Sequence, residues 1–317
     1  MDGREVVLDG DYAYIAGGVG TNALGIVDIS NPLDPEFVSV TTGQTESGHG
    51  LRKQGDYVFL GGRSSKSVEV YDVSDPTTPS PVSFVSDEDF GGLQRMLIVD
   101  DTLYAGVAGS LDPAVDEGDP GLAIFDIENP EDISAVGLLE SGVESIYRPI
   151  QEPGTDRVWC SSYRDGFLQT FDISDRQNPT LTGSFDIPGY NVGRDILLKD
   201  EFVFINDRLD GRVFSVDISN PSDPQVVGTA QSARFEGARD MTFTQSENNI
   251  VLSARDVDRV GVVNIESLSN PSVFTNYTQE DFKGPYGIAY RNGFVMTSHA
   301  GPGDAGQFVV IQPEDEL

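Results

Sequence analysis

A short phrase recurs seven times along the chain at nearly constant intervals, and this repeat constrains the fold more than any other feature. In its clearest form it reads Leu-Gly-Ile-Val-Asp-Ile-Ser-Asn-Pro, over residues 24–32. Its central position falls at Asp28, Asp72, Asp126, Asp172, Asp217, Asn264 and Gln312. The intervals are 44, 54, 46, 45, 47 and 48 residues. Such regularity is not chance, and it predicts seven similar structural units.

Each unit contains four strand signals that are separated by turn residues. In the second copy the strand signals cover residues 50–54, 57–61, 67–73 and 81–85, and no segment shows a helical period. Four short antiparallel strands in about 45 residues are the unit of a β-propeller. We therefore predict an all-β, seven-bladed β-propeller of four-stranded antiparallel blades.

The whole chain, residues 1–317, is expected to form a single propeller domain. The last unit ends after its third strand signal, which predicts either a three-stranded last blade or a chain trimmed at its N-terminus. The blades are placed approximately at residues 4–42, 48–87, 94–140, 146–187, 193–231, 237–279 and 285–313.

The recurring phrase, with Gly-Asp-Tyr-Ala-Tyr-Ile-Ala upstream at residues 10–16, resembles the LVIVD repeat family. That family occurs in archaeal and bacterial proteins, including surface proteins. The resemblance covers essentially the whole chain and implies the propeller fold and an extracytoplasmic or cell-surface location. It implies no particular reaction, because the repeat has no single assigned activity. The first five residues do not look like a signal peptide.

The net charge excludes several classes of partner. The chain has 52 acidic and 20 basic residues, a net charge of −32. A nucleic-acid-binding protein needs a basic footprint, and an anionic membrane would repel this chain. No apolar run approaches about 18 residues, which argues against membrane insertion. The basic residues are 16 Arg and only 4 Lys, and the acids are spread along the chain. This pattern resembles proteins of extreme halophiles.

The antiparallel strand order gives the propeller two different faces. If the first strand of each unit lines the channel, the Asp-Ile-Ser-Asn-Pro turns share one face. There the recurrent aspartate is expected to accept backbone N–H bonds, and the proline fixes φ. The opposite face carries the starts of the first strands, the ends of the second strands and a long insertion at residues 107–120. Long loops on a rigid scaffold often carry function.

Basic residues concentrate on this second face, which holds 12 of the 16 arginines if Arg212, Arg234 and Arg259 are included. Candidate site residues at the starts of the innermost strands are Arg4, His49, Arg95, Arg148, Arg194, Asp195, Arg239, Asp240 and Tyr286. Those at or just past the ends of the second strands are Arg63, Arg164, Arg208, Arg255 and His299. Tyr147 and Tyr190 fall near the same mouth.

Two interpretations of these arginines remain open. They can pair with acids of neighbouring blades and hold the blades together, as dipeptides such as Arg194-Asp195 favour. Alternatively, their guanidinium groups can bind an anionic or carbohydrate-like ligand in a central pocket, with tyrosines available for stacking.

Chemistry that needs a metal, a cofactor or a reactive thiol has little support. Two histidines are too few for a typical zinc site, and the acid-rich stretch at residues 112–119 lacks EF-hand spacing. The only cysteine, Cys160, follows Trp159 in a strand signal and is predicted to be buried. We predict no cofactor and no bound metal.

These observations predict a monomeric binding or interaction module, working at the cell surface or in a larger assembly. Its partner is an unidentified protein or a small anionic or carbohydrate ligand. The alternative is a propeller-type hydrolase or lactonase that uses polar residues at the channel mouth.

Overall fold

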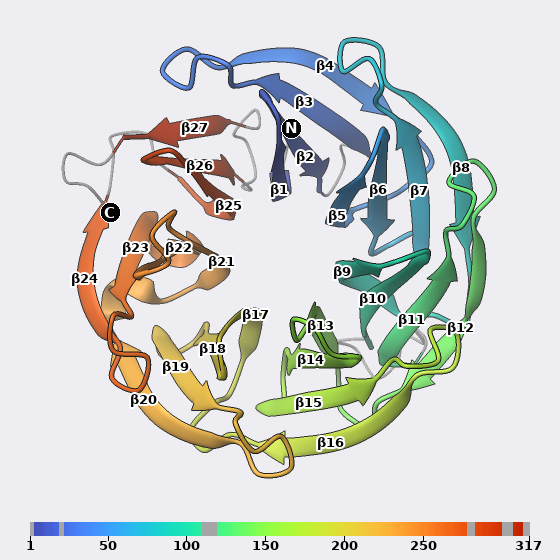
Figure 1. Ribbon diagram of the computed structural model, residues 1–317. Coiled ribbons are helices and arrows are strands. Elements are labelled where there is room, and N and C mark those ends of the chain that lie inside the picture. The colour runs from blue at the N-terminus through green and yellow to red at the C-terminus, as the bar shows by residue number, and fades with distance from the viewer. Residues whose placement is uncertain (1–2, 19–21, 110–118, 278–282, 300–306, 313–317) are drawn as a thin grey trace.

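Seven antiparallel sheets surround one central axis in the computed structural model (Figure 1). The structure describes residues 3–18, 22–109, 119–277, 283–299 and 307–312. In this part of the chain six sheets have four strands and the last sheet has three. The predicted seven-bladed propeller is confirmed, and within the described residues its last blade has three strands.

Each blade begins at the channel and runs outward in chain order. The first two blades contain β1 (Gly3–Asp9), β2 (Tyr12–Gly17), β3 (Ala23–Asp28), β4 (Glu36–Thr42), β5 (Gly48–Gln54), β6 (Tyr57–Gly62), β7 (Ser67–Asp72) and β8 (Ser80–Ser86). The next two contain β9 (Gly92–Val99), β10 (Thr102–Ala108), β11 (Gly121–Asp126), β12 (Ser134–Glu140), β13 (Ile146–Gln151), β14 (Arg157–Ser162), β15 (Phe167–Asp172) and β16 (Thr180–Asp186).

The remaining blades follow the same order. Blades five and six contain β17 (Gly193–Lys199), β18 (Phe202–Asp207), β19 (Arg212–Asp217), β20 (Gln225–Gln231), η1 (Ala233–Phe235), β21 (Ala238–Phe243), β22 (Asn249–Ala254), η2 (Arg255–Val257), β23 (Arg259–Asn264) and β24 (Ser272–Tyr277). Blade seven contains β25 (Pro285–Arg291), β26 (Phe294–His299) and β27 (Phe308–Ile311).

The recurrent aspartate shapes the turn between the third and fourth strands. Asp28 Oδ1 accepts the backbone N–H of Ser30 at 2.8 Å. Asp72, Asp126, Asp172 and Asp217 each accept the N–H two residues on in the same way. These Asx turns confirm the structural role predicted for the repeat motif. The degraded sixth copy keeps the bond with an asparagine side chain.

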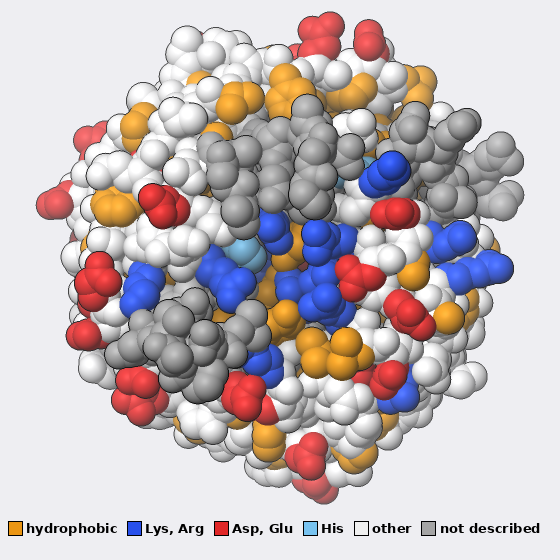
Figure 2. Space-filling view, turned by 180° about the vertical axis from the view of Figure 1, so that it is seen from behind, with side chains coloured by type: hydrophobic (Ala, Val, Ile, Leu, Met, Phe, Trp, Pro, Cys, Tyr) orange, Lys and Arg blue, Asp and Glu red, His pale blue; other side chains and the backbone are white. Residues whose placement is uncertain are grey.

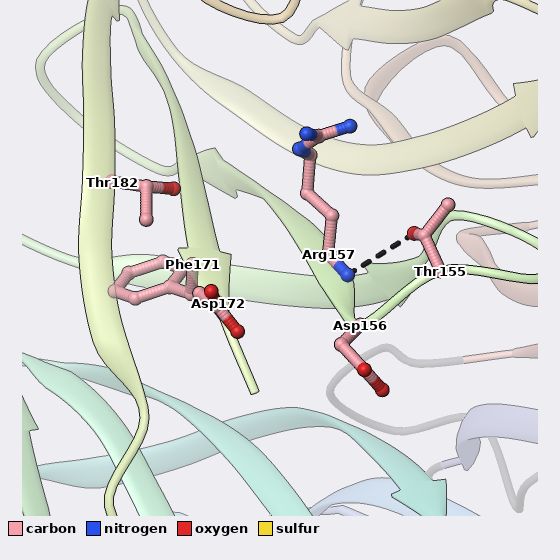
Figure 3. A pocket seen from close by; sticks show the side chains of 6 residues that line it. All are labelled: Thr155, Asp156, Arg157, Phe171, Asp172 and Thr182. Carbon is pink, nitrogen blue, oxygen red and sulfur yellow. Dashed lines mark hydrogen bonds between the residues drawn. The ribbon is translucent and has the colours of Figure 1, made fainter. Parts of the chain in front are cut away.

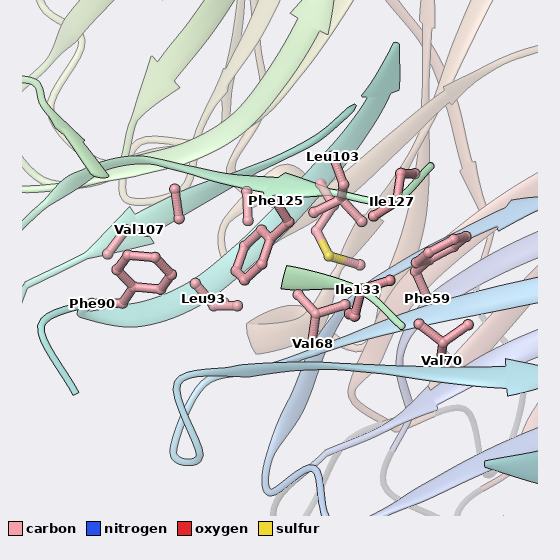
Figure 4. Close-up of a cluster of buried hydrophobic side chains, with 13 residues drawn as sticks. Phe59, Val68, Val70, Phe90, Leu93, Leu103, Val107, Phe125, Ile127 and Ile133 are labelled. Atoms are coloured by element: carbon pink, nitrogen blue, oxygen red, sulfur yellow. The ribbon is translucent and has the colours of Figure 1, made fainter. Parts of the chain in front are cut away.

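The hydrophobic core is divided into seven clusters, and each lies between two adjacent blades. In Figure 4, Phe59, Val68 and Val70 of blade two face Leu103 and Phe125 of blade three. The second and third strands are buried at nearly every position, and successive side chains point to opposite faces, so each sheet packs against both of its neighbours. Cys160 is buried in one of these clusters, as predicted.

Every innermost strand contains a β-bulge at the same place. In β17, for example, Arg194 and Asp195 lie opposite the single residue Asn206, because Gly193 pairs with Asp207 and Ile196 with Ile205. The other six innermost strands show the same shift. A bulge re-aims side chains, and here it brings two consecutive residues per blade to the channel.

A glycine opposite the bulge of β9 allows the inner strands to approach closely. A Cβ on Gly106 would lie 2.6 Å from the carbonyl oxygen of Tyr147 in the next blade. We therefore expect Gly106→Ala to lower the free energy of unfolding by about 1–3 kcal/mol, measured by guanidinium denaturation. The control is Gly137→Ala in β12, where a Cβ would meet nothing within 4 Å. Equal effects of the two changes would contradict this account.

Candidate functional site

Glu5 occupies the second bulge position of β1 and is shared by three arginines. Its Oε1 lies 2.8 Å from Arg52 and 2.8 Å from Arg148, and its Oε2 lies 3.0 Å from Arg95. Burial alone would raise the pKa of Glu5. The attraction of Arg95, Arg52 and Arg148 outweighs that effect and lowers the pKa to about 2.

Two aspartates complete this group. Arg148 Nε lies 2.8 Å from Asp195, and Arg148 Nη2 lies 3.2 Å from Asp240. Arg95 also reaches Asp240, at 3.3 Å. We call Glu5, Arg52, Arg95, Arg148, Asp195 and Asp240 the ionic cluster. Each of blades one to six contributes one member, and the contacts cross the axis from blade three to blade six, so the cluster lies in the channel.

The carboxylates of the ionic cluster also join neighbouring blades. Each accepts a backbone N–H from the innermost strand of the next blade: Leu51 donates to Glu5 at 2.7 Å, Met241 to Asp195 at 2.5 Å and Ile288 to Asp240 at 3.2 Å. The three carboxylates and three guanidinium groups of the ionic cluster give it a formal net charge of zero. Burial raises the pKa of Asp195, and the neighbouring Asp240 raises it further against the opposing effect of Arg148.

A second group lies at the first bulge positions, one residue nearer the mouth. Arg194 donates hydrogen bonds to the hydroxyl oxygens of Tyr286 at 2.5 Å, Tyr163 at 3.0 Å and Tyr147 at 3.3 Å. Its side chain is buried, with 8% of the residue exposed. Within the described residues Arg194 has no carboxylate partner within salt-bridge distance. A buried guanidinium without a carboxylate partner favours a negative charge beside it.

Other arginines surround the ring of Tyr286. The guanidinium carbons of Arg4, Arg239 and Arg194 lie 4.6, 5.5 and 5.7 Å from its centroid. Burial would raise the pKa of the Tyr286 phenol. The attraction of Arg194, Arg4 and Arg239 outweighs burial and lowers the pKa to about 6. The lowered pKa of the phenol thus indicates an excess of positive charge around it.

A carboxylate at the rim partly compensates this charge. Asp256 lies 3.0 Å from Arg239 and 3.3 Å from Arg208, and its side chain is 43% exposed. Arg208 in turn donates to the Tyr163 hydroxyl at 3.3 Å. We call Tyr147, Tyr163, Arg194, Arg208, Arg239, Asp256 and Tyr286 the arginine–tyrosine cluster. Burial and then the repulsion of Arg194 lower the pKa of Arg239 to about 10, which again indicates excess positive charge.

His49 lies beside this cluster as a neutral ring. Its Nδ1 is 3.1 Å from the carbonyl oxygen of Ser47, and its ring meets that of Tyr286 edge-on at 6.5 Å. Burial lowers the pKa of His49 well below its usual value, and Arg4 lowers it further. His49 is therefore uncharged at neutral pH.

The sequence-predicted residues divide between these groups and the rim. Arg95, Arg148, Asp195 and Asp240 belong to the ionic cluster, whereas Arg194, Arg208, Arg239 and Tyr286 belong to the arginine–tyrosine cluster, with Arg4 and His49 beside it. The others lie just past β6 (Arg63), just past β14 (Arg164), in η2 (Arg255) and at the end of β26 (His299). Figure 2 shows Lys and Arg side chains gathered around the centre of one face.

Some expected features fall elsewhere. The Tyr190 hydroxyl donates to the carbonyl oxygen of Ser162, and its ring packs between blades four and five. Most of the long insertion, residues 110–118, lies outside the described residues, as does nearly all of the acid-rich stretch. The described residues contain no group of three His, Cys, Asp or Glu side chains that could hold a metal ion.

The sequence prediction missed Glu5, Arg52 and Tyr163. A register argument could have found Glu5, because it follows Arg4 as Asp195 follows Arg194 and Asp240 follows Arg239. Arg52 lies outside the bulge, and Tyr163 lies in the loop after β14, so no repeated position marks either of them.

The opposite face has a cavity whose polar groups are already bonded. It has a volume of about 190 Å³ and is lined by Thr155, Asp156, Arg157, Phe171, Asp172 and Thr182 (Figure 3). The Arg157 guanidinium pairs with Glu152, Asp156 pairs with Arg176, and Asp172 accepts the turn N–H of Ser174. This cavity is therefore a weaker candidate than the channel mouth.

The repeat family is shown by a sequence profile together with the fold. The LVIVD repeat profile matches residues 2–42 and 192–231, which are blades one and five. The chain is an LVIVD-repeat β-propeller. A comparison with curated proteins found no match. Within its described residues this LVIVD-repeat propeller has no helix with the length and hydropathy needed to cross a bilayer.

Solved structures resemble the LVIVD-repeat propeller in fold. The WD40 propeller domain of Doa1 has a TM-score of 0.75 at 14% identity, with 99% of this chain and 94% of that chain covered. A putative 6-phosphogluconolactonase from Bacteroides uniformis has a TM-score of 0.77 at 10% identity, covering 92% and 90%. Hydrazine synthase from Kuenenia stuttgartiensis has a TM-score of 0.75 at 9% identity, covering 99% and 96%. At these identities the likeness shows the fold alone.

Removing the Glu5 carboxylate should destabilise the propeller strongly. Glu5→Gln leaves buried arginines without their shared partner, so we expect a loss of about 3–5 kcal/mol in the free energy of unfolding. Because its pKa is lowered, Glu5 stabilises the fold at neutral pH and loses this effect only as pH falls through about 2. The control, Asp156→Asn in an exposed ion pair, should cost about 1 kcal/mol or less. Comparable urea midpoints for the two variants would contradict this role.

Proposed function

We propose that this LVIVD-repeat propeller is a binding module that holds a small anionic ligand at the arginine–tyrosine cluster. The observation that carries the proposal is Arg194, a buried guanidinium bonded to three tyrosine hydroxyls and to no carboxylate among the described residues. An anion beside Arg194 and Arg239 would compensate positive charge that Asp256 and the Tyr286 phenolate offset only in part. In a low-dielectric site such compensation is strong.

The residue types favour a carboxylate or phosphate ligand. Guanidinium groups offer forked donors that match the paired oxygens of these anions. Tyr147, Tyr163 and Tyr286 add hydroxyl groups and ring faces, which suit the hydroxylated, partly apolar surface of a sugar. A sugar acid or sugar phosphate combines both features, so this is the ligand class we propose.

The ionic cluster supports this division of roles. Each of its arginines has a carboxylate within 3.3 Å, and each carboxylate also holds a backbone N–H of the next blade. These groups hold the inner strands together and serve as the floor of the proposed site. The pairing interpretation thus applies to Arg95 and Arg148, whereas the ligand interpretation applies to Arg194 and Arg239.

The setting of the module is part of the proposal. The net charge of −32 and the scarcity of lysine support a protein that works in high salt. The LVIVD family includes surface proteins, which supports a location at the cell surface or in a larger assembly. We also propose that the module is a monomer. Dense surface carboxylates repel one another and favour separate molecules unless salt screens them.

A propeller-type hydrolase of the same ligand class is the alternative. It is supported by the neutral, buried His49 edge-on to the Tyr286 ring, a pair that can accept and donate protons. One fold neighbour is described as a putative 6-phosphogluconolactonase, and its name suggests 6-phosphogluconolactone as the test substrate. Turnover of 6-phosphogluconolactone that is lost in His49→Gln would favour the hydrolase.

Binding is tested with 6-phosphogluconate by isothermal titration calorimetry at two KCl concentrations. We expect saturable binding to the unmodified protein and a loss of at least about tenfold in affinity for each of Arg194→Gln and Arg239→Gln, because each removes a charge-assisted hydrogen bond. Neither change leaves a carboxylate without an arginine partner, because Asp256 still pairs with Arg208. The unfolding midpoints should therefore change little.

The matched control is Arg176→Gln, which removes an arginine paired with Asp100 and Asp156 on the opposite face. It should leave the affinity unchanged. No saturable binding of 6-phosphogluconate, gluconate or phosphate to the unmodified protein would refute the proposal. So would a large loss of stability without any change in affinity.

The affinity for an anion should depend on the charge of Tyr286. Above its pKa of about 6 the phenolate offsets the arginines, whereas below that pH the neutral phenol does not. Sulfate, which does not titrate in this range, should therefore bind more tightly as pH falls from 8 to 5, by about tenfold or more. Tyr286→Phe should remove this dependence and the phenolate absorbance at pH 8. A pH profile that persists in Tyr286→Phe would contradict the assignment.

A further inference from the structure

The innermost strands of blades five, six and seven end beside a groove on the face opposite the arginine–tyrosine cluster. β17, β21 and β25 are neighbours around the channel (Figure 1). In β21, Arg239 is the second residue and Phe243 the last, so roughly 13 Å of strand separates the cluster from this end. The groove has a volume of about 450 Å³, within the range of about 300–1,000 Å³ that is usual for ligand pockets. We call it the blade-six groove, and its lining includes Leu197, Phe243, Gln245, Glu247, Tyr290 and Asn292.

A long hairpin forms one wall of the blade-six groove. Residues 244–248 connect β21 to β22, whereas two residues connect β17 to β18 and β25 to β26. The Thr244 N–H donates to the carbonyl oxygen of Asn249 at 2.9 Å, and the Glu247 N–H donates to that of Thr244 at 2.9 Å. Lys199 of blade five donates to the carbonyl oxygen of Glu247 at 2.5 Å. The wall is therefore held in place before any ligand binds, which lowers the entropic cost of binding.

The apolar side chains of the blade-six groove are fixed by the core. Leu197 is 8% exposed, and it packs with Phe243 on the cluster between blades five and six. The Phe243 ring meets that of Phe204 edge-on, with their centroids 6.4 Å apart. Tyr290 packs on the cluster between blades six and seven and is half-buried. These residues give the groove a rigid, partly aromatic surface, which suits the C–H face of a sugar ring.

The rim of the groove has polar groups that are available to a ligand. Gln245, Glu247 and Asn292 are exposed. In the described part of the chain neither their side chains nor the Tyr290 hydroxyl makes a hydrogen bond or an ion pair. The polar groups of the blade-four cavity in Figure 3 are, by contrast, already bonded. A carboxamide can both donate and accept, as a sugar hydroxyl can, and a carboxylate can accept from two hydroxyls.

The charges of the groove do not suit a second anion site. Its arginine, Arg291, already donates to the carbonyl oxygen of Gly10 and lies 3.9 Å from Asp11. The exposed carboxylate of Glu247 would repel an anion. The groove therefore favours a neutral, hydroxylated ligand, unlike the anions that suit Arg194.

We propose that the blade-six groove binds a neutral saccharide of about disaccharide size. Tyr290 and its apolar neighbours contact the C–H groups of the sugar rings, while Gln245, Glu247 and Asn292 form hydrogen bonds with the hydroxyl groups. The site does not rest on the proposed anion site, because the ionic cluster lies in the channel between the two.

The probes are maltose, cellobiose and lactose, each titrated into the protein in concentrated KCl and followed by isothermal calorimetry and saturation-transfer NMR. At least one of them should bind saturably. Gln245→Ala and Asn292→Gly should each weaken that binding about fivefold or more, because each removes a hydrogen bond. Asn292 has a φ of 50°, which glycine adopts without strain, so this change should leave the unfolding midpoint nearly unchanged.

The matched control is Gln225→Ala, which removes an exposed carboxamide from the outer strand β20 and should leave the affinity unchanged. Arg194→Gln separates the two sites, since it should weaken anion binding without affecting the saccharide. The proposal fails if none of the three sugars binds saturably, or if Gln225→Ala weakens binding as much as Gln245→Ala. Saccharide binding that is lost in Arg194→Gln would place the sugar at the arginine–tyrosine cluster and would equally overturn the assignment to the groove.

Discussion

The structure depends on how charge is accommodated where seven innermost strands converge. A bulge in each strand brings two consecutive residues to the channel, so side chains from seven blades meet near one axis. Charged groups there lie in a low-dielectric environment, where an unpaired charge is costly. The ionic cluster meets this constraint with Glu5, which receives three arginines and a backbone N–H. Glycines at the same position in β5 and β25 leave space for the long arginine side chains.

At the first bulge positions, one residue nearer the mouth, the cost of burying charge is only partly offset by pairing. The first bulge positions contain arginine, histidine and tyrosine but no carboxylate, and the nearest described carboxylate, Asp256, is at the rim. The hydroxyls of Tyr147 and Tyr163 accept hydrogen bonds from Arg194 without neutralising it. The excess of positive charge lowers the pKa of Tyr286 against the effect of burial, and it adds to burial in lowering the pKa values of His49 and Arg239. The ionic cluster and the arginine–tyrosine cluster therefore lie one strand position apart, and only the second has the excess positive charge that suits an anion.

The period of the repeat and the Asx-turn aspartates were enough to predict the fold, because each blade forms its strands and its Asx turn from its own local sequence. The candidate site was only partly predictable. Arginines at the strand starts were recognised, but Arg95 and Arg148 are one register position deeper than Arg194 and Arg239. That offset arises because Gln94 and Tyr147 occupy the first bulge positions of β9 and β13, and no local sequence signal marks the bulge itself. Tyr163 and Arg52 act through contacts between blades, and such contacts depend on the closed ring rather than on any one repeat.

The surface charge and the channel charge also respond differently to salt. The acids that give the net charge of −32 are mostly exposed, and at molar salt their fields fall off within about 3 Å. Arg194 and Arg239 are buried, so their potential is screened far less. At low salt the surface acids repel an anion before it reaches the channel. In concentrated salt that repulsion disappears while the field at the mouth persists, so this charge distribution favours an anion at the mouth more in concentrated salt than in dilute salt.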